Sequence, residues 1–376
     1  MLRLGCAFTH YCTNAGLSHI FLSVCRGLGD EIDARLIVPG AAAEYRDARM
    51  IQAVPDALNG LVYKSFQATR ILTERCLLGS LSELDAVYTF PAISPATVKR
   101  IHRTGMPVVL ERVNCARQSA KKVLDDAYRR LVEPIGDVIT TEQVALELDE
   151  IADADYIVCA SPLSKQSFLE CDVPPEKIIE ASYGWSPQRF GTIPPHSRSK
   201  ESFTVLFVGR VCVRKGAHLL LDAWARANVR GRLILVGAME PAIAQSCREI
   251  LARTDVTYLP YTREVGKLYQ EADVFAFPTL TEGSPLVTYE AMAHGLALLV
   301  SPMAAGAVMR DGVEGKVLGP YDADGWVDAL REFASDTALR ERYGQAARVR
   351  ADEFTWDKVA ARRGRELVTH LSGVRQ

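Results

Sequence analysis

The stretch Thr204-Val205-Leu206-Phe207-Val208-Gly209-Arg210 joins an uninterrupted apolar run to a glycine and a cation. Such a run is typical of a strand covered on both faces, as in a parallel sheet. Similar runs recur along the chain, separated by segments with helical spacing, which predicts repeated βαβ units. We expect the other strands near residues 2–8, 34–38, 86–90, 108–111, 156–160, 178–182, 232–236, 256–259, 274–278 and 298–301.

The chain is long enough for two layered domains. Its 376 residues correspond to roughly two and a half domains of about 150 residues. The polar, proline-rich stretch Ile193-Pro194-Pro195-His196-Ser197-Arg198-Ser199-Lys200 lacks a hydrophobic period and is typical of a linker. A doubly wound sheet on each side of it would place a ligand at the carboxyl ends of the strands, between the domains. The expected divisions are a first α/β domain at 1–190, a linker at 191–201, a second α/β domain at 202–355 and an amphipathic terminal helix at 356–376.

Composition and charge exclude several classes of protein. With 48% apolar and 24% charged residues, the composition is that of a globular protein, unlike disordered or coiled-coil chains. The net charge of −2 provides no global attraction for nucleic acid or an anionic membrane. The nine cysteines contain no Cys-x-x-Cys pair, which argues against a disulfide scaffold or zinc site and indicates a reducing compartment. Because no apolar run approaches the roughly 18 residues of a membrane span, we expect a cytoplasmic protein.

The second informative stretch is Phe277-Pro278-Thr279-Leu280-Thr281-Glu282-Gly283-Ser284-Pro285-Leu286-Val287-Thr288-Tyr289-Glu290. Ser284 followed by Pro285 predicts an N-cap and the first helical residue. A helix that starts there presents free backbone N–H groups and its positive dipole end to an anionic ligand. Glu282 and Glu290 bracket this helix start, and their carboxylates can accept strong hydrogen bonds from sugar hydroxyls without a metal ion. The alternative is a capped surface helix with ordinary glutamates.

The loop at 209–216, Gly-Arg-Val-Cys-Val-Arg-Lys-Gly, follows the strand at 204–208 and precedes a helix expected to begin near Ala217. Two or three cations on a glycine-flanked loop at the end of a strand are suited to neutralise a diphosphate, a task that Mg²⁺ performs elsewhere. The loop is neither Gly-x-Gly-x-x-Gly nor a P-loop. Taken alone, it is equally typical of a solvated basic surface.

Together and in this order, these stretches resemble the retaining glycosyltransferases of the GT-B fold, specifically glycosyltransferase family 4, also described as glycosyl transferases group 1. The resemblance runs from about Tyr183 to the C-terminus. It rests on Tyr183-Gly184-Trp185 with Phe190, Gly209-Arg210 with Lys215-Gly216, Ala272-Asp273-Val274, and Glu282-Gly283 through Glu290-Ala291-Met292. It implies an α/β protein with two Rossmann-like, doubly wound parallel-sheet domains that face each other across a cleft, with the C-terminal helix crossing back to the first domain.

The same resemblance implies a role for each matching residue. Arg210 and Lys215 would hold the diphosphate of the donor. Glu282 would contact hydroxyls of the donor sugar, and Glu290 would bind the ribose. Backbone amides of the helix start would meet the phosphate or the sugar. The implied donor-binding set is Gly16, Gly209, Gly283, Ser284, Pro285, Leu286, Val287 and Glu290, and the implied catalytic set is Arg210, Lys215 and Glu282.

The first domain carries a thinner match. Gly16 precedes a helix and resembles the family's glycine loop, which lies near the acceptor and the donor phosphate. Family members commonly place a histidine just after the strand at 108–111, and the position that we align with it is Ala116. Either another residue supplies that contact, or the donor sugar does not need it, or turnover is impaired. The candidates for acceptor or sugar contacts are His10, Asn14, Arg112 and Asn114.

Residues 112–130 hold six cations and two anions, a local net charge of +4. Such a run is usually a solvated face. It is also suited to meet the diphosphate of a lipid-linked acceptor or an anionic membrane, at about 1 kcal/mol per cation close to the surface. Together with a helical stretch expected at 58–78, it makes peripheral contact with the inner face of the membrane a hypothesis to test.

We therefore expect a metal-independent retaining glycosyltransferase without a cofactor. It would move a hexose from a UDP- or GDP-type sugar to a hydroxyl of a glycan or lipid-linked acceptor, in the synthesis of cell-surface polysaccharide or glycoconjugate. No general base is assigned, and nucleic acid is not an expected partner. The alternatives are a GT-B epimerase or phosphorylase, and a catalytically silent sugar-nucleotide-binding partner of another transferase, which Ala116 motivates. A nicotinamide dehydrogenase is disfavoured because neither half has the glycine fingerprint.

Overall fold

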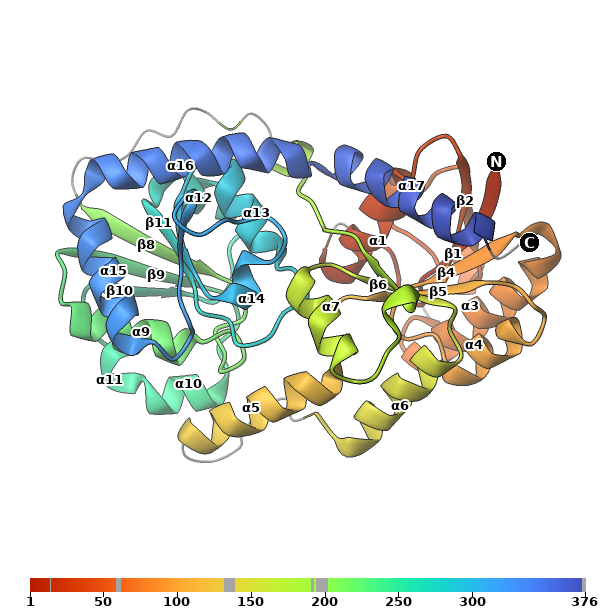
Figure 1. The fold of residues 1–376 in the computed structure, drawn as a ribbon, viewed down its shortest axis with the longest axis horizontal. Helices are drawn as coiled ribbons and strands as arrows, with labels where there is room; N and C mark the ends of the chain where they lie inside the picture. Colours follow the sequence, from red (N-terminus) through yellow and green to blue (C-terminus); the bar gives the residue numbers. More distant parts are fainter. Residues whose placement is uncertain (14, 59–61, 132–138, 191–192, 194–201, 374–376) are drawn as a thin grey trace.

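The computed structural model describes residues 1–13, 15–58, 62–131, 139–190, 193 and 202–373. They form two open sheets that lie side by side, each flanked by helices (Figure 1). Neighbouring strands are parallel throughout both sheets, as the continuous apolar runs predict. The proposed linker at 191–201 lies almost wholly outside the described residues.

The first sheet has seven strands in the order β3-β2-β1-β4-β5-β6-β7. Their bounds are β1 Leu2–Ala7, β2 Ile32–Val38, β3 Met50–Gln52, β4 Ala86–Thr89, β5 Val108–Arg112, β6 Tyr156–Cys159 and β7 Ile178–Glu180. The helices of this half are α1 Gly16–Arg26, α3 Phe66–Ser80, α4 Pro95–His102, α5 Arg117–Leu131, α6 Thr141–Ala152, α7 Pro162–Leu169 and α8 Pro187–Phe190. The order reverses between β1 and β4, which is where a doubly wound sheet opens a crevice for ligands.

The second sheet has six strands in the order β10-β9-β8-β11-β12-β13. Their bounds are β8 Phe203–Val208, β9 Gly231–Val236, β10 Val256–Leu259, β11 Val274–Phe277, β12 Ala297–Val300 and β13 Gly315–Val317. The helices are α9 Ala217–Ala227, α10 Pro241–Ser246, α11 Arg248–Leu251, α12 Val265–Glu271, α13 Leu286–Ala293, α14 Pro302–Ala305, α15 Ala323–Ser335, α16 Thr337–Ala351 and α17 Trp356–Gly373. Here the order reverses between β8 and β11. The loop at 209–216, which follows β8, and the loop at 278–285, which follows β11, therefore leave the sheet at the same edge.

The structure confirms all eleven expected strands, with bounds that differ by at most a few residues. Two strands were missed, β3 and β13, each of three residues at one end of its sheet. Edge strands bury less surface, so they need no apolar run. Of the helix expected at 58–78, residues 59–61 lie outside the described residues; α3 covers the later part and begins at Phe66, where the Ser65 side chain caps it by accepting the Ala68 N–H at 3.3 Å.

Helix α17 crosses back from the second sheet to the first, as expected, and packs beside α1 (Figure 1). Its Arg363 is fully buried and donates to Glu111 of β5 at 2.9 Å. The same carboxylate accepts bonds from the hydroxyls of Tyr88 and Tyr183. A buried charge is tolerated only when it is paired and hydrogen-bonded, so this network holds the end of the chain to the centre of the first sheet.

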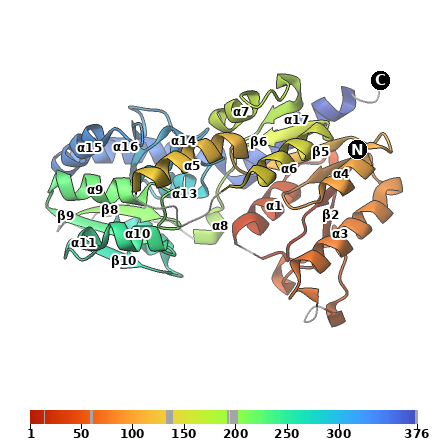
Figure 2. The same cartoon turned by 90° about the horizontal axis from the view of Figure 1, so that it is seen from below.

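Helix α5 reaches in the opposite direction, from the first domain to the second (Figures 1 and 2). The hydroxyl of Tyr128 donates to Glu240 at 2.6 Å, directly before α10. The other oxygen of Glu240 accepts the backbone N–H of Val213 at 2.9 Å. The loop at 209–216 is therefore braced by a carboxylate that a first-domain tyrosine also contacts. Within the described residues, no helix is both long and apolar enough to cross a membrane.

Replacing Arg363 with methionine should leave Glu111 buried without its cation, because the two tyrosines supply no positive charge. We expect the free energy of unfolding to fall by about 3–5 kcal/mol, the usual cost of removing one partner of a buried ion pair. Urea denaturation of Arg363→Met measures this loss. The matched control is Arg365→Met on the exposed face of the same helix, which should stay within about 0.5 kcal/mol of the wild type. Equal effects in the two variants would contradict the assignment.

The contact between α1 and the start of α17 should make stability depend on pH. Trp356 donates to the ring of buried His19 at 3.2 Å. Burial, aided by the charge of Arg189, lowers the pKa of His19 from 6.5 to about 4. The unfolded chain then binds this proton more readily than the folded one, so stability is lost as the pH falls from about 6.5 towards 4.

Urea denaturation at pH 7 and pH 4.5 measures the free energy of unfolding at both values. Between them, this free energy should fall by about 2–3 kcal/mol less in His19→Gln than in the wild type. His102→Gln is the matched control, since the side chain of His102 is 50% exposed. A His19→Gln variant with the same pH dependence as the wild type would show that His19 does not carry the effect.

Candidate functional site

The loop after β8 places two cations on one carboxylate. Arg214 donates to Glu282 at 2.7 Å, and the ammonium group of Lys215 donates to the same oxygen. Lys215 also lies 5.2 Å from the centroid of the Phe277 ring. Gly216 is required at the end of this loop, because a Cβ there would lie 2.0 Å from the carbonyl oxygen of Pro278, and its φ is +70°.

Burial sets the electrostatics of this cluster. Loss of solvent lowers the pKa of Lys215 well below its ordinary value, and the adjacent Arg214 lowers it further. The Glu282 carboxylate, itself 7% exposed, opposes both effects and favours the charged ammonium. The result is a compact set of charges at the carboxyl ends of β8 and β11, in which Glu282 is buried and Arg214 is partly exposed.

The structure separates the cations that the sequence grouped together. Arg210 is exposed at the start of the loop, directly after Gly209. Lys215 is brought to Glu282, as is Arg214, to which no specific role was assigned in the sequence. The sequence pointed to Arg214 only through its place in the same basic loop. Spacing alone does not tell which cation of that loop contacts Glu282.

Glu290, in the second turn of α13, is buried and held by two partners. Arg189 donates to one oxygen at 3.1 Å, and the hydroxyl of Tyr269 donates to the other at 3.1 Å. Burial raises the pKa of Glu290, while Arg189 and the Tyr269 hydrogen bond oppose the rise. Arg189 belongs to the short α8 of the interdomain turn, and no sequence pattern singled it out.

The expected cap of the helix after β11 is wrong by one residue. The helix α13 begins at Leu286, with Pro285 in the N-cap position and no side-chain cap. The hydroxyl of Ser284 instead shares a hydrogen bond of 2.6 Å with the hydroxyl of Tyr289. Pro285 has extended backbone angles, φ −71° and ψ 124°, which move the helix start past it. Leu286 and Val287 therefore form the first turn.

Loops of the two domains meet directly at this point. A Cβ on Gly283 would lie 1.9 Å from the carbonyl oxygen of Val113, so only glycine fits there. The thiol of Cys115 donates to the carbonyl of Glu282 at 2.8 Å, and Ser161 donates to the carbonyl of Gly283 at 2.5 Å. Burial raises the pKa of Cys115 to about 11, which keeps the thiol protonated as a donor.

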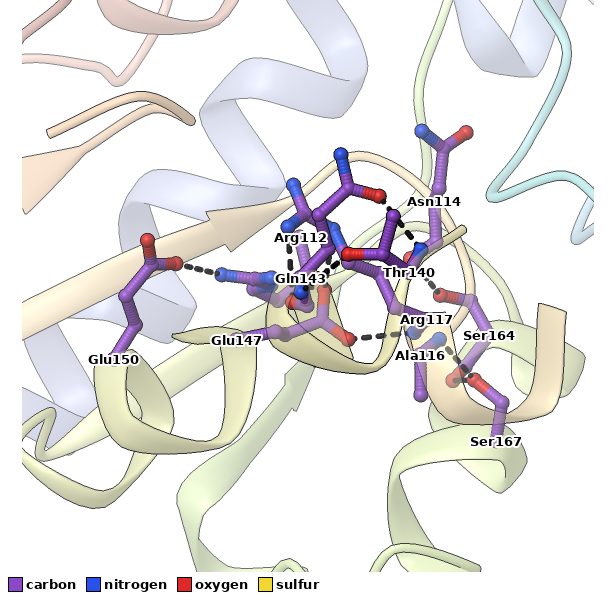
Figure 3. Close-up of polar contacts among 10 residues, drawn as sticks. All are labelled: Arg112, Asn114, Ala116, Arg117, Thr140, Gln143, Glu147, Glu150, Ser164 and Ser167. Atoms are coloured by element: carbon purple, nitrogen blue, oxygen red, sulfur yellow. Dashed lines mark hydrogen bonds and ion pairs between the residues drawn. The ribbon is translucent and has the colours of Figure 1, made fainter. Parts of the chain in front are cut away.

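Arg112 does not lie free in the cleft, as a contact to acceptor or sugar would require. It is 8% exposed and pairs with Glu147 and Glu150 of α6, at 3.0 Å in the second case (Figure 3). The other oxygen of Glu147 accepts the backbone N–H of Arg117 at the start of α5. The local charge of +4 counted over 112–130 omitted these two glutamates, which the fold brings from 35 or more residues away.

Ala116 points into the first domain rather than into the cleft. It is 1% exposed in the core cluster that includes Leu110 and Phe168, and its N–H donates to Ser167 at 2.8 Å (Figure 3). A histidine at this position would have no room and no path to a donor sugar. The position aligned with the family's histidine therefore lies in the core, and whether the protein turns over substrate stays open.

Of the remaining candidates, His10 and Gly16 lie near the start of α1. His10 packs against Phe8 and Phe66, with ring centroids 5.2 and 4.8 Å apart, and burial lowers its pKa. Gly16 is the first residue of α1, with φ +52°. Asn14 lies outside the described residues. Asn114 is exposed, and its amide points away from the glutamates of α6 (Figure 3).

A cavity of about 290 Å³ lies between the domains beside these groups. First-domain residues from Leu17 to Glu147 line one side of it, and Arg214 and Thr281 line the other. Among the residues with known placement, no three histidine, cysteine, aspartate or glutamate side chains gather as metal ligands would.

The contact at Gly283 gives a test of the closed arrangement. A methyl group in Gly283→Ala would overlap the Val113 carbonyl, and such overpacking costs about 1–3 kcal/mol. The population of molecules in which the Val113 loop and the Gly283 loop are separated should rise about 5- to 150-fold. The rate at which a thiol reagent modifies Cys115, located by mass spectrometry, should rise by the same factor.

Gly79→Ala is the control for that measurement, because a Cβ at Gly79 on α3 has nothing within 4 Å. It should leave the modification rate unchanged. An unchanged rate in Gly283→Ala as well would show that the two loops do not close on each other in solution.

Comparison with known proteins shows what the chain is similar to. Residues 202–336 match the family described as Glycosyl transferases group 1. The D-inositol 3-phosphate glycosyltransferase of Corynebacterium aurimucosum is 29% identical over 307 residues, which cover 76% of this chain and 66% of that relative. The alpha-maltose-1-phosphate synthase of Mycobacterium tuberculosis is 33% identical over 174 residues, which cover 41% of this chain and 45% of that relative. The matched part thus spans less than two thirds of the length of these relatives.

Solved structures resemble the whole chain. Sucrose-phosphate synthase from Thermosynechococcus elongatus superposes with a TM-score of 0.74 at 15% identity, covering 99% of this chain and 100% of the other. HepE from Anabaena, in complex with UDP and glucose, superposes with a TM-score of 0.68 at 13% identity, covering 98% of this chain and 100% of the other. At these identities the likeness shows the fold. The chain is therefore a two-domain protein of GT-B fold, and its residues 202–336 are similar to the Glycosyl transferases group 1 family.

Proposed function

We propose that the protein is a glycosyltransferase that moves a hexose from a nucleoside diphosphate sugar to a hydroxyl of an acceptor. The observation that carries this proposal is the convergence of Arg214 and Lys215 on Glu282, beside an interdomain cavity that Arg214 lines. Cations at the carboxyl ends of β8 and β11 are suited to a diphosphate, and a carboxylate beside them is suited to sugar hydroxyls. The D-inositol 3-phosphate glycosyltransferase and HepE, the latter solved with UDP and glucose, support the same class.

In the proposed reaction, the bond between the anomeric carbon and the phosphate oxygen breaks, and the diphosphate leaves with the electron pair. The acceptor oxygen forms the new bond to the anomeric carbon, and its proton passes to an oxygen of the departing diphosphate. Lys215, Arg214 and Arg210 stabilise the charge that builds on the departing diphosphate, in a site from which water is largely excluded. Holding donor and acceptor together in one cavity supplies the remaining rate gain.

The two carboxylates take different parts in this proposal. Glu282 positions the donor sugar once the diphosphate shares its cations, and Glu290 binds the ribose in place of Arg189. Both carboxylates are already desolvated and partnered, so the ligand exchanges one set of hydrogen bonds for another rather than burying a new charge. The amides of Gly283 and the first turn of α13 complete the donor site.

We extend the proposal to a retaining reaction that needs no metal ion or cofactor, with a UDP- or GDP-type donor. Because the cations at 210, 214 and 215 can neutralise a diphosphate, no divalent ion is required for that task. The acceptor is a glycan or a lipid-linked molecule of cell-surface polysaccharide or glycoconjugate synthesis, in the cytoplasm or at the inner face of the membrane. Lys121 and Arg130 of α5 are paired with Asp125 and Asp126, which weakens attraction to anionic lipid.

Calorimetric titration of the metal-free protein with UDP and with GDP tests the donor site. One nucleotide should bind, and Lys215→Ala and Arg210→Ala should each weaken it by about 1.5–3 kcal/mol, the range for a lost charged hydrogen bond. Lys267→Ala, at an exposed position of α12, should leave the dissociation constant unchanged. Binding of neither nucleotide, or an unchanged constant in both site variants, would refute the proposal. Binding without transfer to any acceptor would favour a silent partner.

A further inference from the structure

The interdomain cavity has one wall that the donor does not need. Its volume of about 290 Å³ is at the lower end of the range for small-molecule sites. Arg214 and Thr281 occupy the end next to the proposed donor site, and the opposite wall comes from the first domain. A molecule in this space would reach the donor sugar from the first domain's side.

This first-domain wall is mainly apolar. Side chains from α1, from the segments after β4 and β5, from α5 and from the segment before α6 contribute to it. They are Leu17, Pro91, Val113, Ala120, Leu124 and Ile139. A sugar would leave its hydroxyls without partners against such a surface, and each unsatisfied hydroxyl there is costly.

The charged groups of the wall are already compensated. Arg112 pairs with Glu147 and Glu150, and both oxygens of Glu147 are engaged (Figure 3). Arg117 lies 3.8 Å from Glu147 and donates to the carbonyl of Gln143 at 3.1 Å. A phosphate could take Arg112 only by leaving buried Glu147 without its cation, which is strongly unfavourable.

One polar group of the wall is left available. The amide of Asn114 is exposed and points away from the charged cluster (Figure 3). The Asn114 side chain makes no hydrogen bond with another described residue. It lies on the loop between β5 and α5, one residue from Val113 and Cys115, which contact the second domain. A hydroxyl near this loop has a donor and an acceptor within its reach.

We propose that the cavity binds an uncharged acceptor with an apolar body, whose hydroxyl meets Asn114 and the Arg214 end while its apolar part lies against Leu17, Leu124 and Ile139. The inference rests on the proposed transferase function and narrows its acceptor class. It favours an alcohol on an aliphatic or aromatic body over a phosphorylated polyol. In this respect the chain differs from the relatives whose names carry a sugar or polyol phosphate.

Titration with alkyl β-D-glucosides tests the apolar wall. The methyl, butyl and hexyl compounds share one hydroxylated head and differ only in the chain. Each added methylene that enters the cavity should tighten the dissociation constant by roughly two- to fourfold. myo-Inositol 1-phosphate serves as the anionic probe and should not bind at the concentration at which hexyl glucoside saturates.

Leu17→Gln and Ile139→Gln place a polar group in the wall at two partly exposed positions, where folding should be retained. Each should weaken hexyl glucoside at least about threefold and leave methyl glucoside unchanged. The matched control is Leu146→Gln on α6, a leucine that is 48% exposed and does not line the cavity. Circular dichroism and thermal unfolding confirm that all three variants are folded.

The outcomes separate this inference from the proposed function. Affinity independent of chain length, an unchanged hexyl affinity in both wall variants, or tight binding of inositol phosphate would overturn the apolar acceptor while nucleotide binding stands. Absence of UDP and GDP binding would refute the transferase, and the acceptor assignment with it, even if the alkyl chains bind. Nucleotide binding together with a chain-length effect that both wall variants abolish supports the two proposals.

Discussion

The buried ion pair between Arg363 and Glu111 is the constraint on which the arrangement of the two domains depends. It joins the last helix to the carboxyl end of β5, the strand that also positions Arg112 and the loop at 113–115. Because Glu111 accepts from Tyr88 and Tyr183 as well, its charge is compensated without water. One strand end is thereby tied at once to α17, to α6 through Arg112, and to the second domain through Val113 and Cys115.

The candidate site follows a common electrostatic rule. Each buried carboxylate that faces the cleft already has a cation or hydroxyl partner: Glu282 has Lys215 and Arg214, Glu290 has Arg189 and Tyr269, and Glu147 has Arg112. Burial disfavours the charged form of a carboxylate that has no such partner. At Glu282 and Glu290, a ligand that arrives with its own charges or hydroxyls can replace a partner at little cost in desolvation. A ligand without such groups must use the apolar wall instead.

Much of the fold could be predicted because parallel strands buried on both faces leave a strong mark in a sequence. The run at 205–208 and its equivalents located eleven strands, and the short edge strands β3 and β13 escaped because little of their surface needs an apolar side chain. The site was predicted only in part. Lys215 and Glu282 do converge, but Ser284 does not cap its helix, Arg112 is paired within its own domain and Ala116 points into the core.

The sequence by itself determined the two sheets, the basic loop after β8 and the two glutamates around the start of α13, because hydrophobic period, glycine position and motif spacing are local properties. Only the tertiary structure decided which charges meet. Arg112 and Glu147 are 35 residues apart, Arg189 and Glu290 are 101 apart, and Cys115 and Glu282 are 167 apart. Long-range pairs of this kind depend on the order of the strands and on how the two domains close. Local residue spacing predicts neither of these.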